Sequence, residues 1–168
     1  MTSAPVEGPD SVVPHRRASG GNAVVTISAA LDYALRALCT LATAPRPLTA
    51  QELADSQELP RKFLEGILTE LTRSGLLRSR RGSDGGYSLA RSADRIVVSD
   101  IVELLVGTLV EVRGRQPNDV TYQGAPLHLS TVWSGLQASV QAVLDQVTIA
   151  DIVAGRIPFP VPLPVGRD

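Results

Sequence analysis

The stretch from Thr49 to Arg91 constrains the fold more than any other part of this chain. It begins with Thr49-Ala-Gln-Glu52, a capping-box sequence that satisfies two unpaired donors at the start of a helix. A turn over 57–59 follows, and Pro60 then suits the first position of a second helix. Apolar residues recur at helical spacing in that second helix and are expected to face the core: Phe63, Leu64, Ile67, Leu68 and Leu71.

A short basic hairpin is expected after the second helix. Gly75 suits the left-handed position that ends a helix. The segments 76–81 and 87–90 are typical of two strands, and the glycine-rich stretch 82–86 joins them, which indicates a β-hairpin. Helix, turn, helix and hairpin together predict a winged helix-turn-helix. The fold class is therefore expected to be mainly α with a small β-wing, plus a long C-terminal dimerisation helix.

Positive charge is concentrated in this region, although the chain as a whole is slightly acidic. Residues 60–95 contain eight Lys or Arg and four Asp or Glu, a net charge of +4, whereas the whole chain carries −1. A local basic surface attracts the DNA phosphate backbone even when the overall charge does not. Most charge runs are solvated faces, but Arg78, Arg80 and Arg81 in one hairpin, beside a helix with a basic start, favour DNA binding.

Composition excludes several classes of protein. The chain has 168 residues, of which 43% are hydrophobic and 20% charged, as in ordinary globular domains. Its single cysteine, Cys39, cannot form an intrachain disulfide, and a buried structural thiol is the better interpretation than a redox sensor. No apolar run is long enough to span a membrane, and the N-terminus lacks an apolar signal region. We therefore expect a cytoplasmic protein with no membrane partner.

The rest of the chain divides around the winged helix. The expected regions are a disordered extension over 1–26, a winged helix-turn-helix domain over 27–97 (helix-turn-helix 50–73, wing 76–90), a connecting helix, loop and dimerisation helix over 98–156, and a proline-rich tail over 157–168. His15-Arg16-Arg17 in the extension could touch DNA as a basic arm, but a flexible tail is the better interpretation.

Local signals define the elements outside the helix-turn-helix. A first helix is expected over 28–43, and Ser99 is expected to cap the connecting helix, which Gly107 ends. Thr148-Ile-Ala-Asp151 is typical of a capping box at the start of a short helix that Gly155 ends. A short strand is expected over 109–112 and a loop over 113–129. His128 has no second His or Cys at ligand spacing, so we expect a lone loop histidine and no metal site.

The helix expected over 131–148 carries a long apolar stripe and, apart from Asp145, no charge. Such a stripe either closes the monomer core or forms a symmetric dimer seam. We expect it to do both, with the dimer using most of the surface. The candidate interface residues are Val132, Trp133, Leu136, Val140, Val143, Leu144 and Val147.

Three stretches of the chain resemble the Rrf2 family of bacterial transcriptional regulators. Residues 27–38 look like the family's opening helix, and residues 133–153 are similar to its dimerisation helix and the short helix after it. The most specific likeness lies in 59–87, which resembles its recognition helix and wing. The resemblance implies a homodimer that binds a pseudo-palindromic double-stranded DNA operator, usually as a repressor.

The resemblance also implies which residues meet DNA. Lys62, Phe63 and Glu65 fall on recognition-helix positions, and Arg81 falls on the wing arginine that enters the minor groove. A guanidinium suits the negative potential of a narrow minor groove, and a glutamate can accept a hydrogen bond from cytosine. Basic residues at the start of the recognition helix would hold phosphates. The full candidate set is Thr49, Arg61, Lys62, Phe63, Glu65, Arg73, Arg80, Arg81 and Gly82.

The chain departs from the family's pattern in its sensing region. Relatives that sense iron or nitric oxide hold an iron–sulfur cluster with three cysteines in the loop before the long helix, whereas 113–129 contains none. We therefore expect no cofactor and a likeness to the cluster-free branch, whose members respond to small molecules or partner proteins. Two further departures lie in the DNA-binding region. Asp84 brings an acid to the wing tip, where the family often has glycine, and Gly66 offers no side chain on the recognition helix, where relatives often have a polar one.

Two other classes of function are considered. A winged helix could act as a protein-interaction module through a partner protein, without specific DNA binding, and partner binding would then survive charge reversal at Arg81. An enzyme is disfavoured because the segment 82–86 lacks both the lysine spacing and the strand-loop-helix context of a phosphate-binding loop. No Ser-His-Asp or Cys-His arrangement is evident, so no catalytic residue is expected.

Overall fold

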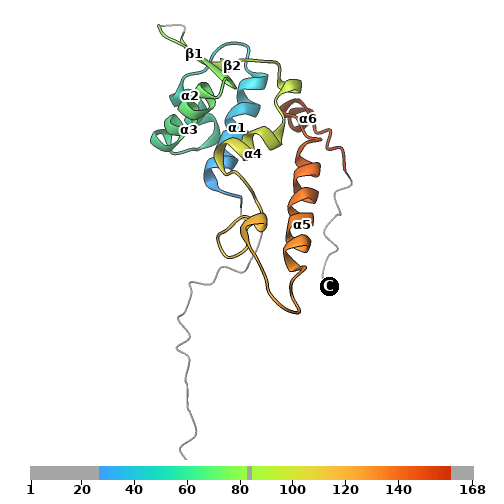
Figure 1. Cartoon of the computed structure of the whole chain (residues 1–168). Coiled ribbons are helices and arrows are strands. Elements are labelled where there is room, and N and C mark those ends of the chain that lie inside the picture. The colour runs from blue at the N-terminus through green and yellow to red at the C-terminus, as the bar shows by residue number, and fades with distance from the viewer. Residues whose placement is uncertain (1–26, 83–84, 160–168) are drawn as a thin grey trace, which may run out of the picture.

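The computed structural model describes residues 27–82 and 85–159 (Figure 1). The expectations for the extension 1–26 and its basic arm, for Asp84, and for the tail beyond residue 159 lie outside the described residues. The elements in chain order are α1 (Ala29–Thr43), α2 (Ala50–Gln57), α3 (Arg61–Arg73), β1 (Leu77–Arg80), β2 (Gly86–Leu89), η1 (Ala93–Arg95), α4 (Val98–Leu105), η2 (Pro117–Asp119), α5 (Leu129–Leu144) and α6 (Ile149–Ala154). The fold is mainly helical with a two-stranded antiparallel sheet, as predicted.

The core forms around α1, which contacts α2, α3, α4, α6 and β2. Ser28 caps α1 by accepting a hydrogen bond from the Leu31 amide at 3.2 Å. Because the chain has few aromatic residues, branched aliphatic side chains fill the interior. The largest of these fully buried side chains are Leu31, Leu38, Leu53, Leu64, Leu68, Leu71, Ile96, Ile101 and Ile149.

The capping box at the start of α2 is confirmed. The Thr49 hydroxyl accepts from the Glu52 amide at 3.2 Å, and the Thr49 amide donates to Glu52 Oε2 at 2.8 Å. Arg46 adds an ion pair to Glu52 Oε1 at 2.6 Å. The hydrogen bond from Arg46, with those from Thr49, lowers the pKa of Glu52 to about 2.

Two expectations for α3 need correction. Pro60 is the N-cap of α3 rather than its first helical residue, because α3 begins at Arg61. Phe63 is not in the core: its side chain is 49% exposed, since it lies at the edge of the apolar stripe, where its ring forms a T-shaped pair with Tyr33. Leu64, Ile67, Leu68 and Leu71 are buried as predicted. Gly75 follows the helix with φ of 77°, which confirms its left-handed role.

The wing is the hairpin of β1 and β2. Leu77 pairs with Leu89 and Arg80 with Gly86. Leu48 extends this ladder, because its amide donates to the Tyr87 carbonyl at 3.0 Å and its carbonyl accepts from the Tyr87 amide at 2.7 Å. Gly86 has φ of 144°, and a Cβ there would lie 2.6 Å from the Leu48 carbonyl carbon and oxygen. Only glycine allows this close approach of the two backbones.

The start of α4 differs from the prediction. Val97 occupies the N-cap, while Ser99 is buried inside the first turn and does not cap the helix. The Val98 amide donates to the Val147 carbonyl, and the Ile149 amide donates to the Ile96 carbonyl, each at 2.9 Å. This backbone pairing with the segment before α6 holds the chain at residues 96–98 and determines where α4 begins.

The strand expected over 109–112 is absent from the described chain. Val112 instead pairs with Arg115 across a tight turn, and the short helix η2 lies within the expected loop. Gly107 has φ of 81° and ends α4 as predicted. Residues 107–128 therefore form a long connection between α4 and α5, and η2 within this connection contacts α5.

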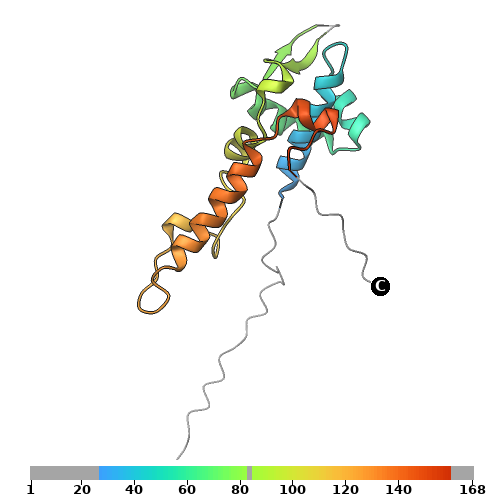
Figure 2. The ribbon, with the colours of Figure 1, turned by 90° about the vertical axis from the view of Figure 1, so that its right-hand side faces the viewer.

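The long C-terminal helix α5 extends from the body at the end opposite the wing (Figures 1 and 2). It begins two residues earlier and ends four residues earlier than the predicted 131–148. No residue of α5 is buried. Val147 lies beyond the helix and is buried in the core, so it is not available for the dimer seam, and its inclusion there was wrong. No helix in the described part of the chain is long and apolar enough to cross a membrane.

The short helix α6 ties α5 back to the body. Thr148 and Asp151 form the expected capping box, in which the Thr148 hydroxyl accepts from the Asp151 amide at 3.1 Å. Gly155 ends the helix with φ of 66°. Because α6 packs against α1, the C-terminal end of α5 is anchored to the helical core that carries α3.

Candidate nucleic-acid interface

The first turn of α3 exposes the residues expected to meet DNA. Arg61, Lys62 and Phe63 are all exposed there, and the first turn contains no acidic residue. The N-terminal end of a helix carries partial positive charge from its unpaired amides. Together with two basic side chains this creates a positive surface suited to phosphate oxygens.

Arg61 is part of a hydrogen-bonded network between α2 and α3. Its Nε donates to Glu65 Oε1, and its Nη1 donates to Gln51 Oε1, both at 2.9 Å. Glu65 is half-buried, and Arg61 pairs with one of its carboxylate oxygens, Oε1. The other oxygen, Oε2, forms no hydrogen bond with another described side chain and so can still accept from a base.

A second network, which was not predicted from the sequence, packs against the start of α3. Arg36 of α1 donates from Nε to Gln57 Oε1 at 3.3 Å and also donates to the Gln57 carbonyl. The Arg36 guanidinium lies 5.9 Å from the Tyr33 ring, whose edge-to-face contact with Phe63 has a centroid distance of 5.7 Å. Arg36 thus joins the end of α2 to the start of α3. The only indication of this network in the sequence is that Tyr33 and Arg36 are three residues apart and therefore lie on the same face of α1.

The wing presents a group of exposed arginines. Side chains alternate along a strand, so Arg78 and Arg80 lie on one face of β1, opposite Leu77 and Ser79. Arg81 follows directly, and none of these three arginines forms an ion pair with another described residue. The hairpin projects beyond the body at the end of the molecule where α2 and α3 lie (Figure 1).

Three further candidates have different surroundings. Gly82 has φ of 110°, a conformation that favours glycine, directly after Arg81. Thr49 is exposed at the start of α2, but its hydroxyl serves the capping box. Arg73 lies at the other end of α3, about 18 Å along the helix axis from Arg61, and is paired with Glu70 at 2.8 Å. The structure therefore does not bring Arg73 to the surface formed by the first turn of α3.

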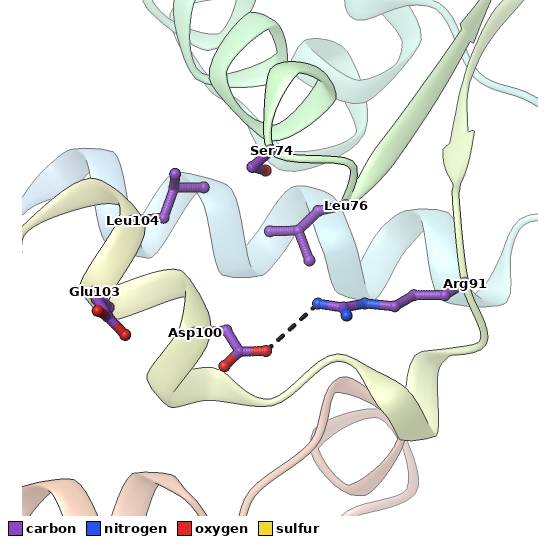
Figure 3. Close-up of a pocket in the computed structure, with 6 residues that line it drawn as sticks. All are labelled: Ser74, Leu76, Arg91, Asp100, Glu103 and Leu104. Carbon is purple, nitrogen blue, oxygen red and sulfur yellow. Dashed lines mark hydrogen bonds and ion pairs between the residues drawn. The ribbon is translucent and has the colours of Figure 1, made fainter.

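A pocket lies where the wing meets α4 (Figure 3). Its volume is about 310 Å³, and its lining residues are Ser74, Leu76, Arg91, Asp100, Glu103 and Leu104. Arg91 reaches from the segment after β2 to Asp100 on α4, at 3.4 Å. Glu103 stands at the other end of the pocket, away from this ion pair. Because Arg91 and Asp100 are both exposed, the pair adds little stability, but it does connect the wing to α4.

Comparison with known proteins identifies close likenesses in sequence. The family model described as Rrf2, iron-dependent transcriptional regulator, matches residues 27–155. A Mycobacterium tuberculosis protein classed among HTH-type transcriptional regulators is 40% identical over 134 residues, covering 79% of this chain and 83% of the relative. The HTH-type transcriptional regulator IscR of Cereibacter sphaeroides is 32% identical over 131 residues, covering 74% and 84%.

The donor set of this chain does not fit an iron–sulfur cluster. Such clusters are held mainly by several cysteine thiolates, and this chain contains one cysteine. Cys39 lies on α1 and is half-buried against the core, and burial raises the pKa of its thiol, which disfavours the thiolate. Among the described residues, no three His, Cys, Asp or Glu side chains form a group that could hold a metal ion.

Solved structures show the same fold. The CymR protein of B. subtilis, titled the global cysteine regulator, matches with a TM-score of 0.66 and 28% identity, over 79% of this chain and 98% of that chain. IscR of T. potens matches with a TM-score of 0.63 and 29% identity, over 77% and 87%. The family model covers the winged helix, α4, the loop, α5 and α6 together. The chain therefore belongs to the Rrf2 family of winged helix-turn-helix transcriptional regulators.

Proposed function

We propose that the protein is a homodimeric, sequence-specific DNA-binding repressor that binds a pseudo-palindromic operator through α3 and the wing residue Arg81. The observation that carries this proposal is the pairing of two exposed basic surfaces at one end of the molecule. These are the first turn of α3, with Arg61 and Lys62, and the wing, with Arg78, Arg80 and Arg81. In this arrangement α3 enters the major groove and the wing arginine reaches the adjacent minor groove.

The dimer is proposed because several apolar side chains of α5 are exposed to solvent in the part of the protomer that the structure describes. Val132, Leu136 and Val143 are 58%, 45% and 39% exposed. These residues fall on one side of α5, and a second copy of the same helix would cover them across a twofold axis. Two recognition helices related by that axis read two related half-sites, which is why the proposed operator is pseudo-palindromic.

Arg81→Ala tests the proposal directly. An operator is first selected from random duplex DNA, and its affinity is then measured over a range of salt concentrations. The variant should bind about tenfold to a hundredfold more weakly and lose about one unit of salt dependence, as expected for an arginine that contacts DNA. Folding should not change, because Arg81 is exposed and makes no described ion pair.

Arg95→Ala is the matched control, since Arg95 is an exposed arginine on η1, outside α3 and the wing. It should bind DNA like the parent protein. If Arg81→Ala also binds like the parent, the role proposed for the wing is wrong. If no duplex is selected above background, the chain is not a sequence-specific DNA-binding protein, and a protein-interaction module becomes the better explanation.

A further inference from the structure

A polar cavity lies between α4, the connection that follows it, and α5. Its volume is about 540 Å³. The connection runs beside α5 in both views (Figures 1 and 2). The lining residues are Glu103, Gly107, Gln116, Asn118, Ser134, Gln137, Ala138 and Gln141. Amide, hydroxyl and carboxylate groups thus form most of its surface, which sets it apart from the apolar face of α5.

The cavity and the apolar face occupy opposite sides of α5. Ser134, Gln137 and Gln141 recur at intervals of three and four residues and line the cavity. Leu136 and Val143, seven residues or two helical turns apart, lie on the other side of the helix and are exposed. One helix therefore carries both the proposed dimer contact and the wall of the cavity.

The groups that line the cavity call for a ligand that donates hydrogen bonds. The Oε1 atom of Gln137 is buried and has no hydrogen-bond partner among the described residues. A buried acceptor without a partner is unfavourable, so a rotation of the Gln137 side chain that turns its oxygen towards a donor in the cavity would be stabilising. The side-chain nitrogen of Gln141 donates to Asp145 at 3.0 Å, which leaves the Gln141 oxygen as a second acceptor.

The charge of the cavity is negative. Glu103 on α4 supplies a carboxylate, and none of the described residues that line the cavity is basic. Glu103 also has no ion-pair partner among the described residues. An anionic ligand would meet an uncompensated carboxylate, whereas a cation would be attracted to it.

We propose that this cavity binds a small organic cation with several N–H donors, namely an aliphatic amine or a guanidino compound. Its charged group lies against the Glu103 carboxylate, and its N–H groups donate to the side-chain oxygens of Gln137 and Gln141. The same ligand would thereby join α4 to α5, which otherwise have few contacts with each other.

This site is suited to regulation, a step that rests on the proposed DNA-binding function. The connection is attached to α5 by two hydrogen bonds: Ser134 Oγ donates to Asn118 Oδ1 at 2.7 Å, and Trp133 Nε1 donates to the Tyr122 hydroxyl at 3.1 Å. Because no residue of α5 is buried, a ligand that bridges α4 and α5 can change the direction of α5. Glu103 also lines the pocket beside the wing (Figure 3), so α4 contributes to the cavity and to the pocket that Arg91 lines just after the wing.

Trp133 provides the readout, since it is the only tryptophan in the chain and precedes Ser134 in the cavity wall. The full-length protein is titrated with agmatine and with putrescine, and binding is followed by tryptophan fluorescence and by calorimetry. Glucose and succinate serve as neutral and anionic comparison compounds. We expect saturable binding of at least one cation and of neither comparison compound.

Three variants test the contacts. Gln137→Leu and Glu103→Gln should each weaken cation binding about tenfold or more, since the first removes an acceptor and the second removes the negative charge. Gln137→Glu keeps the size of the side chain and adds a second carboxylate, so it should bind the cation at least as tightly as the parent. Gln146→Leu is the control, because Gln146 is exposed beyond the end of α5 and outside the cavity. It should not change binding.

The proposal is overturned if neither cation binds by either method, if glucose or succinate binds equally well, or if both weakening variants bind like the parent. Operator binding is measured separately, without any ligand. A protein that binds its operator but neither cation would refute this inference alone. A protein that binds a cation but no operator would refute the proposed function and leave the binding site in place.

Discussion

Leu136 is expected to be a main contact of the proposed dimer. Its side chain is 45% exposed in the protomer, in the middle of α5. Full burial of a leucine side chain contributes about 1.5–3 kcal/mol, so burial of the exposed part contributes roughly 0.7–1.4 kcal/mol. A twofold axis brings the Leu136 side chains of both protomers into the interface, so together they contribute roughly 1.4–2.7 kcal/mol to dimer formation.

Leu136→Ala should therefore raise the dissociation constant of the dimer by about tenfold to a hundredfold. Sedimentation equilibrium over a range of protein concentrations measures that constant, and circular dichroism checks that the helices are retained. Gln141→Ala is the matched control, because Gln141 lies on the opposite, cavity-lining side of α5. If Leu136→Ala dimerises as tightly as the parent protein, α5 does not form the dimer seam.

Two further predictions concern stability. Gly86→Ala should lower the free energy of unfolding by about 2–5 kcal/mol, because its Cβ would overlap the neighbouring backbone at a positive φ. Gly66→Ala, at a helical position with open space, should instead raise the free energy of unfolding by about 0.5–1 kcal/mol. If chemical denaturation shows that the two substitutions change this free energy equally, the packing argument is wrong. The pKa of Glu52 is about 2 in the folded protein against an ordinary 4.5, so its carboxylate stabilises the fold above pH 4.5 and this contribution is lost as the pH falls towards 2. In Glu52→Gln the melting temperature should therefore fall less between pH 4.5 and pH 2 than in the parent protein. If the two proteins show the same dependence of melting temperature on pH, the role given to Glu52 is wrong.

Local signals predicted most of the secondary structure correctly. The capping boxes at Thr49 and Thr148 and the stops at Gly75, Gly107 and Gly155 depend on residues within one turn of each other. Such interactions form wherever the sequence occurs, so they can be recognised without the rest of the chain. The basic residues in the first turn of α3 and in the wing are exposed, as expected for charged side chains that have no buried partner.

The errors arose where distant segments meet. Ser99 has the side chain of a cap, but pairing of residues 96–98 with 147–149 determined the start of α4 and buried Ser99. The same pairing ended α5 early and drew Val147 into the core. Phe63 follows the apolar spacing of α3, yet only the packing of α1 against α3 decides that it stays half exposed.

The sequence by itself determined the family, the order of the main helices and the wing, and the segments where basic residues are concentrated, because each depends on neighbouring residues and their spacing. The tertiary structure alone decided which polar groups act together. Gln51 meets Arg61 only because α2 packs on α3, and Glu103 and Gln137 line one cavity only because α5 returns beside α4. Contacts of this kind depend on the relative placement of whole helices, which side-chain spacing along one helix does not specify.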